Sequence, residues 1–217
     1  MCIIAPSVLE ADYLELRKQL KMMEDSGVKY LHIDLMDGNY VPNISFGLRM
    51  IACIRMAGSF VLDVHMMVQE PVRFADALYV AGADIVTVHF DACRDPEYTL
   101  KKIKSLNMKA GIVLNPEDTL EILSGEILQE ADVIQLMSVE PGIPNQNFRE
   151  DTIEKIEALR GMIYYANGRA VIEVDGGINF ANAGKVINAG ADIIVSGKTL
   201  FNGDFCSNYF KMKQIIM

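Results

Sequence analysis

Residues 81–90 read AGADIVTVHF and residues 189–197 read AGADIIVSG, so one pattern occurs twice in this chain. In each copy a helical stretch ends at Ala-Gly, the chain turns at Ala-Asp, and a run of mostly β-branched residues follows. A short turn from a helix into a continuously apolar strand is typical of a parallel sheet that is buried on both faces. The repeated pattern therefore predicts a chain of alternating helices and strands.

Apolar runs of strand length recur along the whole sequence. Eight of them are rich in β-branched residues, and we predict strands at 2–6, 30–34, 60–65, 84–89, 109–114, 133–137, 170–175 and 192–196. Longer stretches between them, such as 12–25 and 149–165, carry apolar residues at helical spacing among charged ones. Four glycines follow helical stretches and are expected to end them: Gly27, Gly82, Gly161 and Gly190.

Eight strand–helix units fill the 217 residues and leave no room for a second domain, so we expect one domain over residues 1–217. Two α/β architectures compete, a closed (β/α)8 TIM barrel and an open doubly wound sheet. The number of units favours the barrel. The turn after the first strand, Pro6-Ser7-Val8-Leu9-Glu10, also lacks the glycine pattern of a dinucleotide-binding sheet. We therefore predict a single (β/α)8 barrel with short loops.

The composition argues against several classes of partner. The formal net charge is −9 and no basic stripe is present, which argues against nucleic-acid binding. No apolar run reaches the roughly 20 residues that cross a bilayer, and the N-terminus lacks the pattern of a signal peptide. The four cysteines are scattered without a C-x-x-C pair, as in a protein with reduced thiols. We expect a cytoplasmic protein that binds neither membranes nor nucleic acid.

Polar side chains occur where the predicted strands end, which is where a barrel carries its active site. His32 and Asp34 are two residues apart and face the same way, His65 ends the third strand, and Asp175 ends the seventh. Two imidazoles and two carboxylates form a ligand set suited to Zn²⁺, Fe²⁺ or Mn²⁺ rather than Mg²⁺. An ion between the carboxylates also keeps both ionised. The sequence therefore predicts one divalent metal site.

For each polar strand-end residue, a purely structural role has to be weighed against metal binding. A single strand-end histidine is more often structural than a ligand, but H-x-D and D-x-H at adjacent strand ends favour ligands at His32 and His65. His89 has only Asp91 as a carboxylate two residues away, and we interpret it as structural. Asp37 is expected to brace its loop, and Asp63 to make a structural hydrogen bond or to support a ligand.

Glycine-rich turns follow the last two predicted strands. They read Gly176-Gly177 and Gly197-Lys198, at the two loops that often bind phosphate in barrels. Glycine lets backbone N–H groups approach an anion, and Lys198 adds a point charge. Glycines that only turn the chain are the alternative, but the position of both turns favours a phosphate site.

Three blocks of the sequence are distinctive: H-x-D-x-M-D-G-x-x-V-P-N at 32–43, DVHMMV at 63–68 and EVDGGIN at 173–179. In these blocks and from end to end the chain resembles the ribulose-phosphate 3-epimerase family, and the first block is the most specific match. The resemblance implies a ribulose-phosphate-binding type of (β/α)8 barrel, one bound divalent metal ion and a homo-oligomer. It also implies the activity, which is inversion of C3 of a ketose phosphate by two-carboxylate proton transfer through a metal-stabilised enediolate. The expected substrate is D-ribulose 5-phosphate, with D-xylulose 5-phosphate as product in the pentose phosphate pathway.

The resemblance also implies roles for individual residues. His32, Asp34, His65 and Asp175 match the metal ligands, and Asp34 and Asp175 match the two acid/base carboxylates as well. The residues that match substrate contacts, including three methionines that their spacing alone would assign to the core, are Ser7, His65, Met36, Met67, Met137, Gly142, Ile143, Pro144, Asn145, Gly176, Gly177, Gly197 and Lys198.

Two loops depart from the family pattern. Where the family usually reads P-G-F-G-G-Q, this chain has PGIPNQ at 141–146, and Pro144 lacks the N–H that an anion could use. After the eighth strand the family usually has glycine then serine, but here Lys198 follows Gly197. We hypothesise that the charge of Lys198 compensates for the altered sixth loop.

Three alternatives stay open. The first is the same chemistry on D-allulose 6-phosphate, and the second is a non-catalytic paralogue that only binds sugar phosphates. The third is a barrel decarboxylase of the orotidine or ketogulonate phosphate type, which uses a D-x-K-x-x-D arrangement. The second strand here has no lysine between Asp34 and Asp37, which argues against the third alternative.

Overall fold

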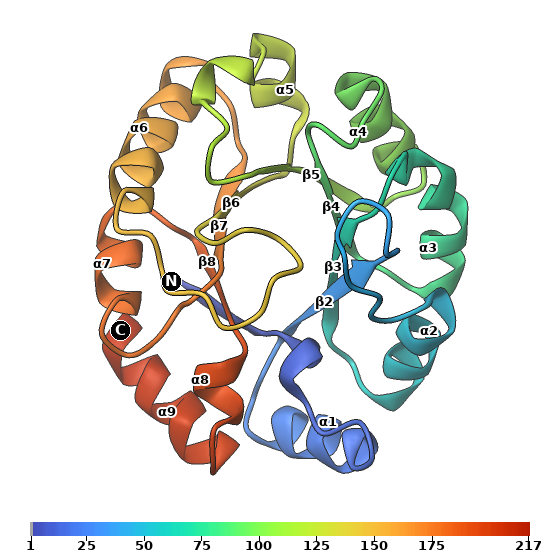
Figure 1. Cartoon of the computed structure of the whole chain (residues 1–217), viewed down its shortest axis with the longest axis vertical. Helices are drawn as coiled ribbons and strands as arrows, with labels where there is room; N and C mark the ends of the chain where they lie inside the picture. The colour runs from blue at the N-terminus through green and yellow to red at the C-terminus, as the bar shows by residue number, and fades with distance from the viewer. Residues whose placement is uncertain (1) are drawn as a thin grey trace.

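A computed structural model describes residues 2–217, and its centre is a barrel of eight parallel strands surrounded by helices (Figure 1). The neighbouring strands follow the order β1-β8-β7-β6-β5-β4-β3-β2, and a bridge between Ser7 and His32 brings β1 against β2. The prediction of a (β/α)8 barrel is confirmed. The strands are β1 (Ile3–Pro6), β2 (Tyr30–Met36), β3 (Val61–Met67), β4 (Ile85–His89), β5 (Lys109–Leu114), β6 (Val133–Met137), β7 (Val171–Asp175) and β8 (Ile193–Ser196).

Helices form the outer ring of the molecule (Figure 1). They are α1 (Leu16–Asp25), α2 (Leu48–Ala57), α3 (Ala75–Ala81), α4 (Pro96–Ser105), α5 (Gly125–Glu130), α6 (Thr152–Tyr165), α7 (Ala183–Asn188), α8 (Lys198–Phe201) and α9 (Phe205–Ile216). Single 3₁₀ turns lie at η1 (Val8–Glu10), η2 (Pro71–Phe74) and η3 (Leu120–Ile122). Within residues 2–217, no helix combines the length and the apolar character that a bilayer crossing requires.

The helix boundaries correct two details of the sequence prediction. The predicted helices at 12–25 and 149–165 begin a few residues later, at Leu16 and Thr152. Gly161 does not end a helix but lies inside α6, since helical spacing alone does not show which glycine stops a helix. The other three glycines do follow helices with positive φ, as at Gly82 with φ of 92°.

The two faces of the barrel wall differ in chemistry. Outward-facing residues such as Leu31, Ile33 and Leu35 join the main apolar core beneath the helices. The intervening residues carry polar groups that are buried inside the barrel and must find partners there, because unpaired polar atoms are costly in an apolar interior. They are His32, Asp34, Asp63, His65, Thr87, His89, Gln135 and Glu173.

The two AGAD repeats make the same contact at the amino ends of the strands. The Asp84 carboxylate accepts a hydrogen bond from the Leu62 N–H at 2.8 Å and pairs with Arg55. Asp192, in the second repeat, accepts from the Ile172 N–H at 2.8 Å. Each aspartate thus ties the start of one strand to the strand before it. This end of the barrel is organised for stability, and the functional groups gather at the other end.

Candidate active site

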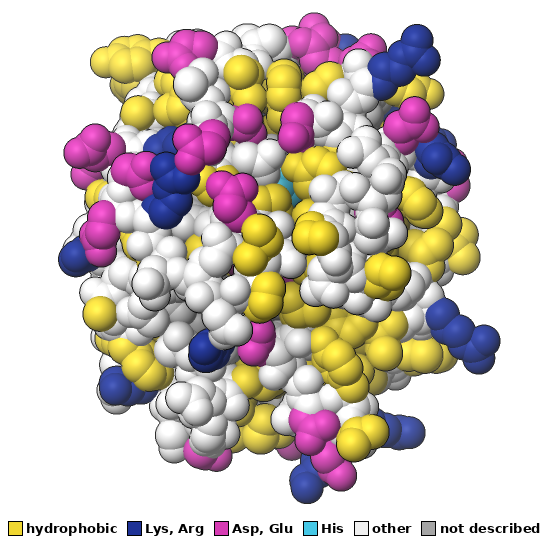
Figure 2. Space-filling model, in the orientation of Figure 1, with side chains coloured by type: hydrophobic (Ala, Val, Ile, Leu, Met, Phe, Trp, Pro, Cys, Tyr) yellow, Lys and Arg dark blue, Asp and Glu magenta, His cyan; other side chains and the backbone are white. Residues whose placement is uncertain are grey.

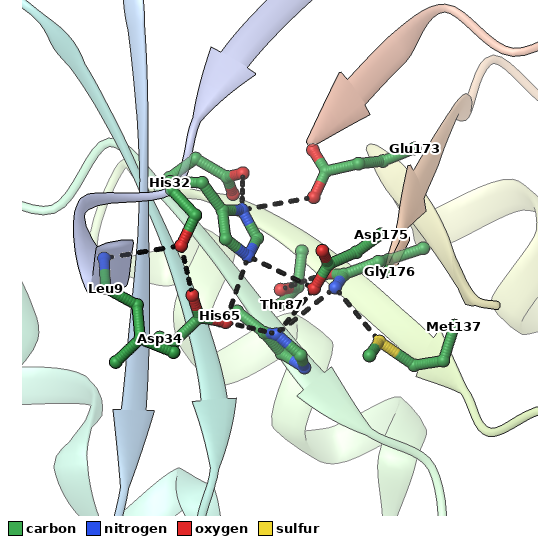
Figure 3. Close-up of polar contacts among 12 residues, drawn as sticks. Leu9, His32, Asp34, His65, Thr87, Met137, Glu173, Asp175 and Gly176 are labelled. Atoms are coloured by element: carbon green, nitrogen blue, oxygen red, sulfur yellow. Dashed lines mark hydrogen bonds and ion pairs between the residues drawn. The ribbon is translucent and has the colours of Figure 1, made fainter. Parts of the chain in front are cut away.

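The four predicted metal ligands converge inside the carboxyl end of the barrel (Figure 3). His32 Nε2 lies 3.4 Å from Asp34 Oδ1 and 3.7 Å from Asp175 Oδ2. His65 Nδ1 lies 3.2 Å from Asp34 Oδ1 and 3.6 Å from Asp175 Oδ2. Strands β2, β3 and β7 supply these side chains, and one ligand atom from each lies within 4.8 Å of all the others.

This arrangement fits a four-coordinate metal ion. Ligand atoms about 2.1 Å from a tetrahedral ion lie about 3.4 Å from one another, which agrees with the separations between the histidine nitrogens and the carboxylate oxygens. His32 Nε2 points into the group, is fully buried and has no hydrogen-bond partner among residues 2–217. A buried ring nitrogen without a partner is what a bound cation would satisfy, with loss of any proton that the nitrogen carries. The buried group can therefore hold a metal ion.

Two further carboxyl groups lie behind His32. Asp63 Oδ2 is 2.7 Å from His32 Nδ1, so Asp63 makes its hydrogen bond to a predicted ligand. The Glu173 carboxyl lies 3.4 Å from the same nitrogen. Burial, reinforced by the charge of Asp63, holds the pKa of Glu173 well above its usual value, so this side chain stays neutral. Glu173 was not predicted as part of the site, although its place two residues before Asp175 puts it on the inward face of β7.

The charges in the group depend on one another. Burial alone would lower the pKa of His32, but the charges of Asp34 and Asp63 outweigh burial and hold that pKa well above its usual value. Burial alone would raise the pKa of Asp34, but His32 and His65 hold it well below its usual range. Asp34 is therefore an ionised carboxylate in a buried site, and it requires positive charge beside it.

Ser7 orients one of these carboxylates. Its hydroxyl donates to Asp34 Oδ2 at 2.6 Å and accepts from the Leu9 N–H at 3.4 Å, because Ser7 caps the 3₁₀ turn η1 (Figure 3). One oxygen of Asp34 thus faces Ser7 and the other faces the two histidines. The hydrogen bond from Ser7 therefore fixes the orientation of the Asp34 carboxylate.

Polar partners also surround the ring of His65. His65 Nε2 lies 2.8 Å from His89 Nε2, and the Gln135 amide nitrogen lies 3.2 Å from His65 Nδ1. The Thr87 hydroxyl donates to the Gln135 oxygen at 2.7 Å. Burial, followed by the proximity of His65, holds the pKa of His89 well below its usual value, so its ring is neutral. Gln135 was missed because its apolar neighbours made β6 appear uniformly hydrophobic, and only its place two residues before Met137 marks it as inward-facing.

A cavity of about 390 Å³ opens above the four ligands at the carboxyl ends of the strands. Figure 2 shows part of a histidine between hydrophobic side chains in the upper half of this face, with lysines and arginines mostly toward the edge. Of the predicted contact residues, His65 lies below the cavity, and the others line it: Ser7, Met36, Met67, Met137, Gly142, Ile143, Pro144, Asn145, Gly176, Gly177, Gly197 and Lys198.

The loop after β6 covers one side of the cavity and crosses the barrel opening in Figure 1. The Gln146 side chain folds this loop by donating to the carbonyls of Glu140 and Ile143 at 2.7 and 2.8 Å. Lys198 donates to Asn145 Oδ1 at 3.0 Å and so connects the loop to the turn after β8. The two departures from the family pattern, in the sixth and eighth loops, are therefore in direct contact.

Backbone conformation and steric contacts explain why two glycines follow β7. Gly176 and Gly177 adopt positive φ values of 111° and 62°. A Cβ atom on Gly177 would lie 2.7 Å from the backbone nitrogen of Phe148, in the sixth loop. Only glycine combines this conformation with this close approach. The backbone of the seventh loop can therefore lie directly against the loop that covers the cavity.

A (β/α)8 barrel with a buried His₂Asp₂ group beneath a cavity at its carboxyl end defines a barrel enzyme that can hold a metal ion. Residues 3–201 match the profile of the Ribulose-phosphate 3 epimerase family. The ribulose-phosphate 3-epimerase of Bacillus subtilis is 38% identical over 202 residues, which are 93% of each chain. The chloroplastic ribulose-5-phosphate-3-epimerase of Arabidopsis thaliana is 41% identical over 92% of this chain and 71% of its own. This chain belongs to the ribulose-phosphate 3-epimerase family.

More distant solved structures share the fold. The 3-hexulose-6-phosphate synthase of Salmonella typhimurium aligns over 99% of this chain and 98% of its own, with a TM-score of 0.72 and 17% identity. Orotidine 5'-phosphate decarboxylase from Pyrococcus horikoshii aligns over 100% and 99%, with a TM-score of 0.67 and 17% identity. At this level of identity the likeness shows the barrel fold alone, and the family assignment rests on the sequence matches.

Proposed function

We propose that this chain is a metal-dependent epimerase that inverts C3 of a ketose phosphate and interconverts D-ribulose 5-phosphate and D-xylulose 5-phosphate. The observation that carries the proposal is the pair of carboxylates, Asp34 on β2 and Asp175 on β7, at the base of one cavity. Two other strands, β1 and β8, separate β2 from β7, so the carboxylates come from different parts of the barrel wall. The relatives named above carry the same activity in their names.

Asp34 and Asp175 exchange a proton with C3 from opposite faces of the substrate. One carboxylate removes the proton next to the carbonyl while the other returns a proton to the opposite face, and the two roles reverse with direction. A divalent ion held by His32, Asp34, His65 and Asp175 supplies Lewis-acid stabilisation of the negative charge that develops on the ketose O2. Ser7 keeps the Asp34 carboxylate oriented through its 2.6 Å hydrogen bond.

The rest of the cavity binds and encloses the substrate. Met36, Met67 and Met137 are buried against the proposed reaction centre and provide soft apolar walls that exclude water. The backbone of Gly176, Gly177 and Gly197 approaches the phosphate, since none of these residues has a side chain in the way. The sixth loop, which includes Gly142, Ile143, Pro144 and Asn145, covers this end.

Lys198 is expected to bind the phosphate directly. The Lys198→Ser variant should raise KM for the sugar phosphate by about 10- to 100-fold, because a charge-assisted hydrogen bond contributes roughly 1.5–3 kcal/mol. The kcat should change much less, since the phosphate is bound equally in the ground state and the transition state. Steady-state kinetics of the natural protein and of Lys198→Ser measure KM and kcat.

Lys185→Ser is the matched control, because Lys185 lies on α7 and pairs with Glu150 at 3.3 Å rather than lining the cavity. It should leave KM unchanged. An unaltered KM in Lys198→Ser would contradict the proposal that this charge compensates for Pro144.

An assay of the metal-supplemented chain on D-ribulose 5-phosphate and on D-allulose 6-phosphate tests the proposed function. We expect a kcat/KM for D-ribulose 5-phosphate at least about tenfold higher than for D-allulose 6-phosphate. One changed contact in the binding pocket is enough to produce a difference of this size. Preference for the hexulose phosphate would instead favour the related six-carbon epimerase. Binding of both compounds with no turnover by metal-loaded protein would indicate a paralogue that only binds sugar phosphates.

We also propose Zn²⁺, Fe²⁺ or Mn²⁺ as the resident ion, because the nitrogen and oxygen donors match these ions better than Mg²⁺. The remaining proposals are a cytoplasmic homo-oligomer and a single functional domain over residues 1–217. Metal analysis of the purified protein and light scattering address the ion and the assembly.

A further inference from the structure

The ring of His65 is held from both of its nitrogens. Its Nδ1 faces the carboxylates of Asp34 and Asp175 at 3.2 and 3.6 Å, which makes Nδ1 the atom available to a metal ion. Its Nε2 points the other way, to His89 Nε2 at 2.8 Å. Both rings are fully buried, and with centroids 4.9 Å apart they meet edge to edge, so neither ring can turn without breaking this contact.

A hydrogen bond between two imidazole nitrogens needs one donor and one acceptor. When His65 uses the Nδ1 lone pair for a cation, its own proton must lie on Nε2, and His89 Nε2 must then be the acceptor. Before an ion binds, the Gln135 amide favours the same tautomer of His65, because it presents a donor to the Nδ1 lone pair. Thr87 donates to its oxygen, so the NH₂ group, which can only donate, faces His65 Nδ1 at 3.2 Å.

We propose that His89 is a positioning residue that fixes the metal-binding tautomer of His65 by accepting a hydrogen bond from His65 Nε2–H. The inference rests on the proposed metal centre, and it assigns a role to a histidine that its sequence context had marked as structural. His89 does not contact the substrate or the ion. It acts through His65 and fixes both the location of the proton and the plane of the ring.

The far side of His89 supports this assignment. If its Nε2 accepts, the proton of the His89 ring lies on Nδ1, which is buried and makes no hydrogen bond within residues 2–217. The Asn115 side chain lies beside this ring, and its buried oxygen also lacks a partner in the same part of the chain. Asn115 donates through its nitrogen to Tyr40 and Asp91 at 3.1 and 3.3 Å, so its amide is oriented with the oxygen free to accept.

Zinc affinity tests the proposal without reference to catalysis. His89→Leu fills the same space with an apolar side chain but removes the acceptor. In this variant Zn²⁺ should bind about 10- to 100-fold more weakly, measured in competition with a chromogenic chelator. His89→Gln places an acceptor oxygen near the same point and should restore affinity to within a few-fold of the natural protein. Thermal unfolding of the metal-free variants shows whether each is folded.

A second measurement uses the natural chain, so the test does not depend on any variant folding. Long-range ¹H–¹⁵N spectra of the Zn²⁺-loaded protein should show His65 with its proton on Nε2 and His89 with its proton on Nδ1. A zinc-bound His65 Nε2, or a proton on His89 Nε2, would overturn the assignment. So would equal zinc affinity in the natural, Leu and Gln proteins. Failure of the natural protein to bind zinc would overturn the metal centre itself and this inference with it.

Discussion

Substitution of Asp175 by asparagine is expected to lower kcat by about 10³-fold or more and to abolish exchange of the C3 proton with solvent for at least one of the two epimers. Asparagine has nearly the same shape, but its amide cannot accept the proton that a catalytic carboxylate takes from carbon. General acid–base catalysis contributes about 10²- to 10⁴-fold, and the variant also lacks one charged ligand of the proposed ion. Incorporation of deuterium from D₂O, followed separately from each epimer, measures the effect.

The most specific part of this prediction is that C3-proton exchange is lost from one epimer and not from the other. With two bases on opposite faces, Asp34 remains able to act on one epimer while the other has no base. Asp192→Asn is the matched control, because Asp192 lies at the amino end of β8, pairs with Arg160 and does not line the cavity. Full exchange from both epimers in Asp175→Asn would eliminate the two-carboxylate mechanism.

Removal of divalent metal is expected to have an effect of similar size. Chelation should lower kcat by about 10³-fold, which corresponds to roughly 4 kcal/mol of lost stabilisation for the charge on O2. Activity should return with Zn²⁺, Fe²⁺ or Mn²⁺ and much less with Mg²⁺, because imidazole nitrogen is a poor ligand for Mg²⁺. Kinetics after dialysis and reconstitution, with elemental analysis of each sample, provide the measurement.

Thermal unfolding gives an independent readout of the same site. A ligand that binds only the folded state raises its stability, so the reconstituted protein should unfold at a higher temperature than the chelated one. The increase should disappear in His32→Leu, which removes the buried nitrogen that points into the group. Undiminished turnover by protein shown to be free of metal would contradict the proposed role of the ion.

The part of this site that can be recognised from the sequence depends on residues that are close together along the chain. His32 and Asp34 lie two residues apart on one strand, and Asp63 and His65 repeat that spacing on the next, so a period of two predicts that each pair faces the barrel interior. The positions of the strands followed from continuous β-branched runs, and two of them, β5 and β6, were predicted to the residue. A parallel barrel then brings the carboxyl ends of all eight strands to one end.

Other parts of the site depend on side chains whose sequence context is uninformative. His89 was interpreted as structural because its own strand offers it no carboxylate, yet its nearest polar neighbour is His65 on the adjacent strand. Gln135 and Glu173 each lie two residues before a recognised site residue, but an isolated polar side chain in an apolar run does not show what it contacts. Lys198 and Asn145 are 53 residues apart, and their contact appears only once the loops are folded.

The sequence by itself therefore determined the (β/α)8 architecture, the end of the barrel that carries the chemistry and the four residues proposed to hold the ion, because each depends on spacing within a strand or on the order of strands along the chain. Only the tertiary structure decided which nitrogen of each histidine faces the two carboxylates, which partners contact the other nitrogens and how the sixth loop meets the eighth. Closure of the barrel places strands distant in sequence opposite one another, and hydrogen bonds inside it are set by angstrom-scale separations that no spacing along the chain encodes.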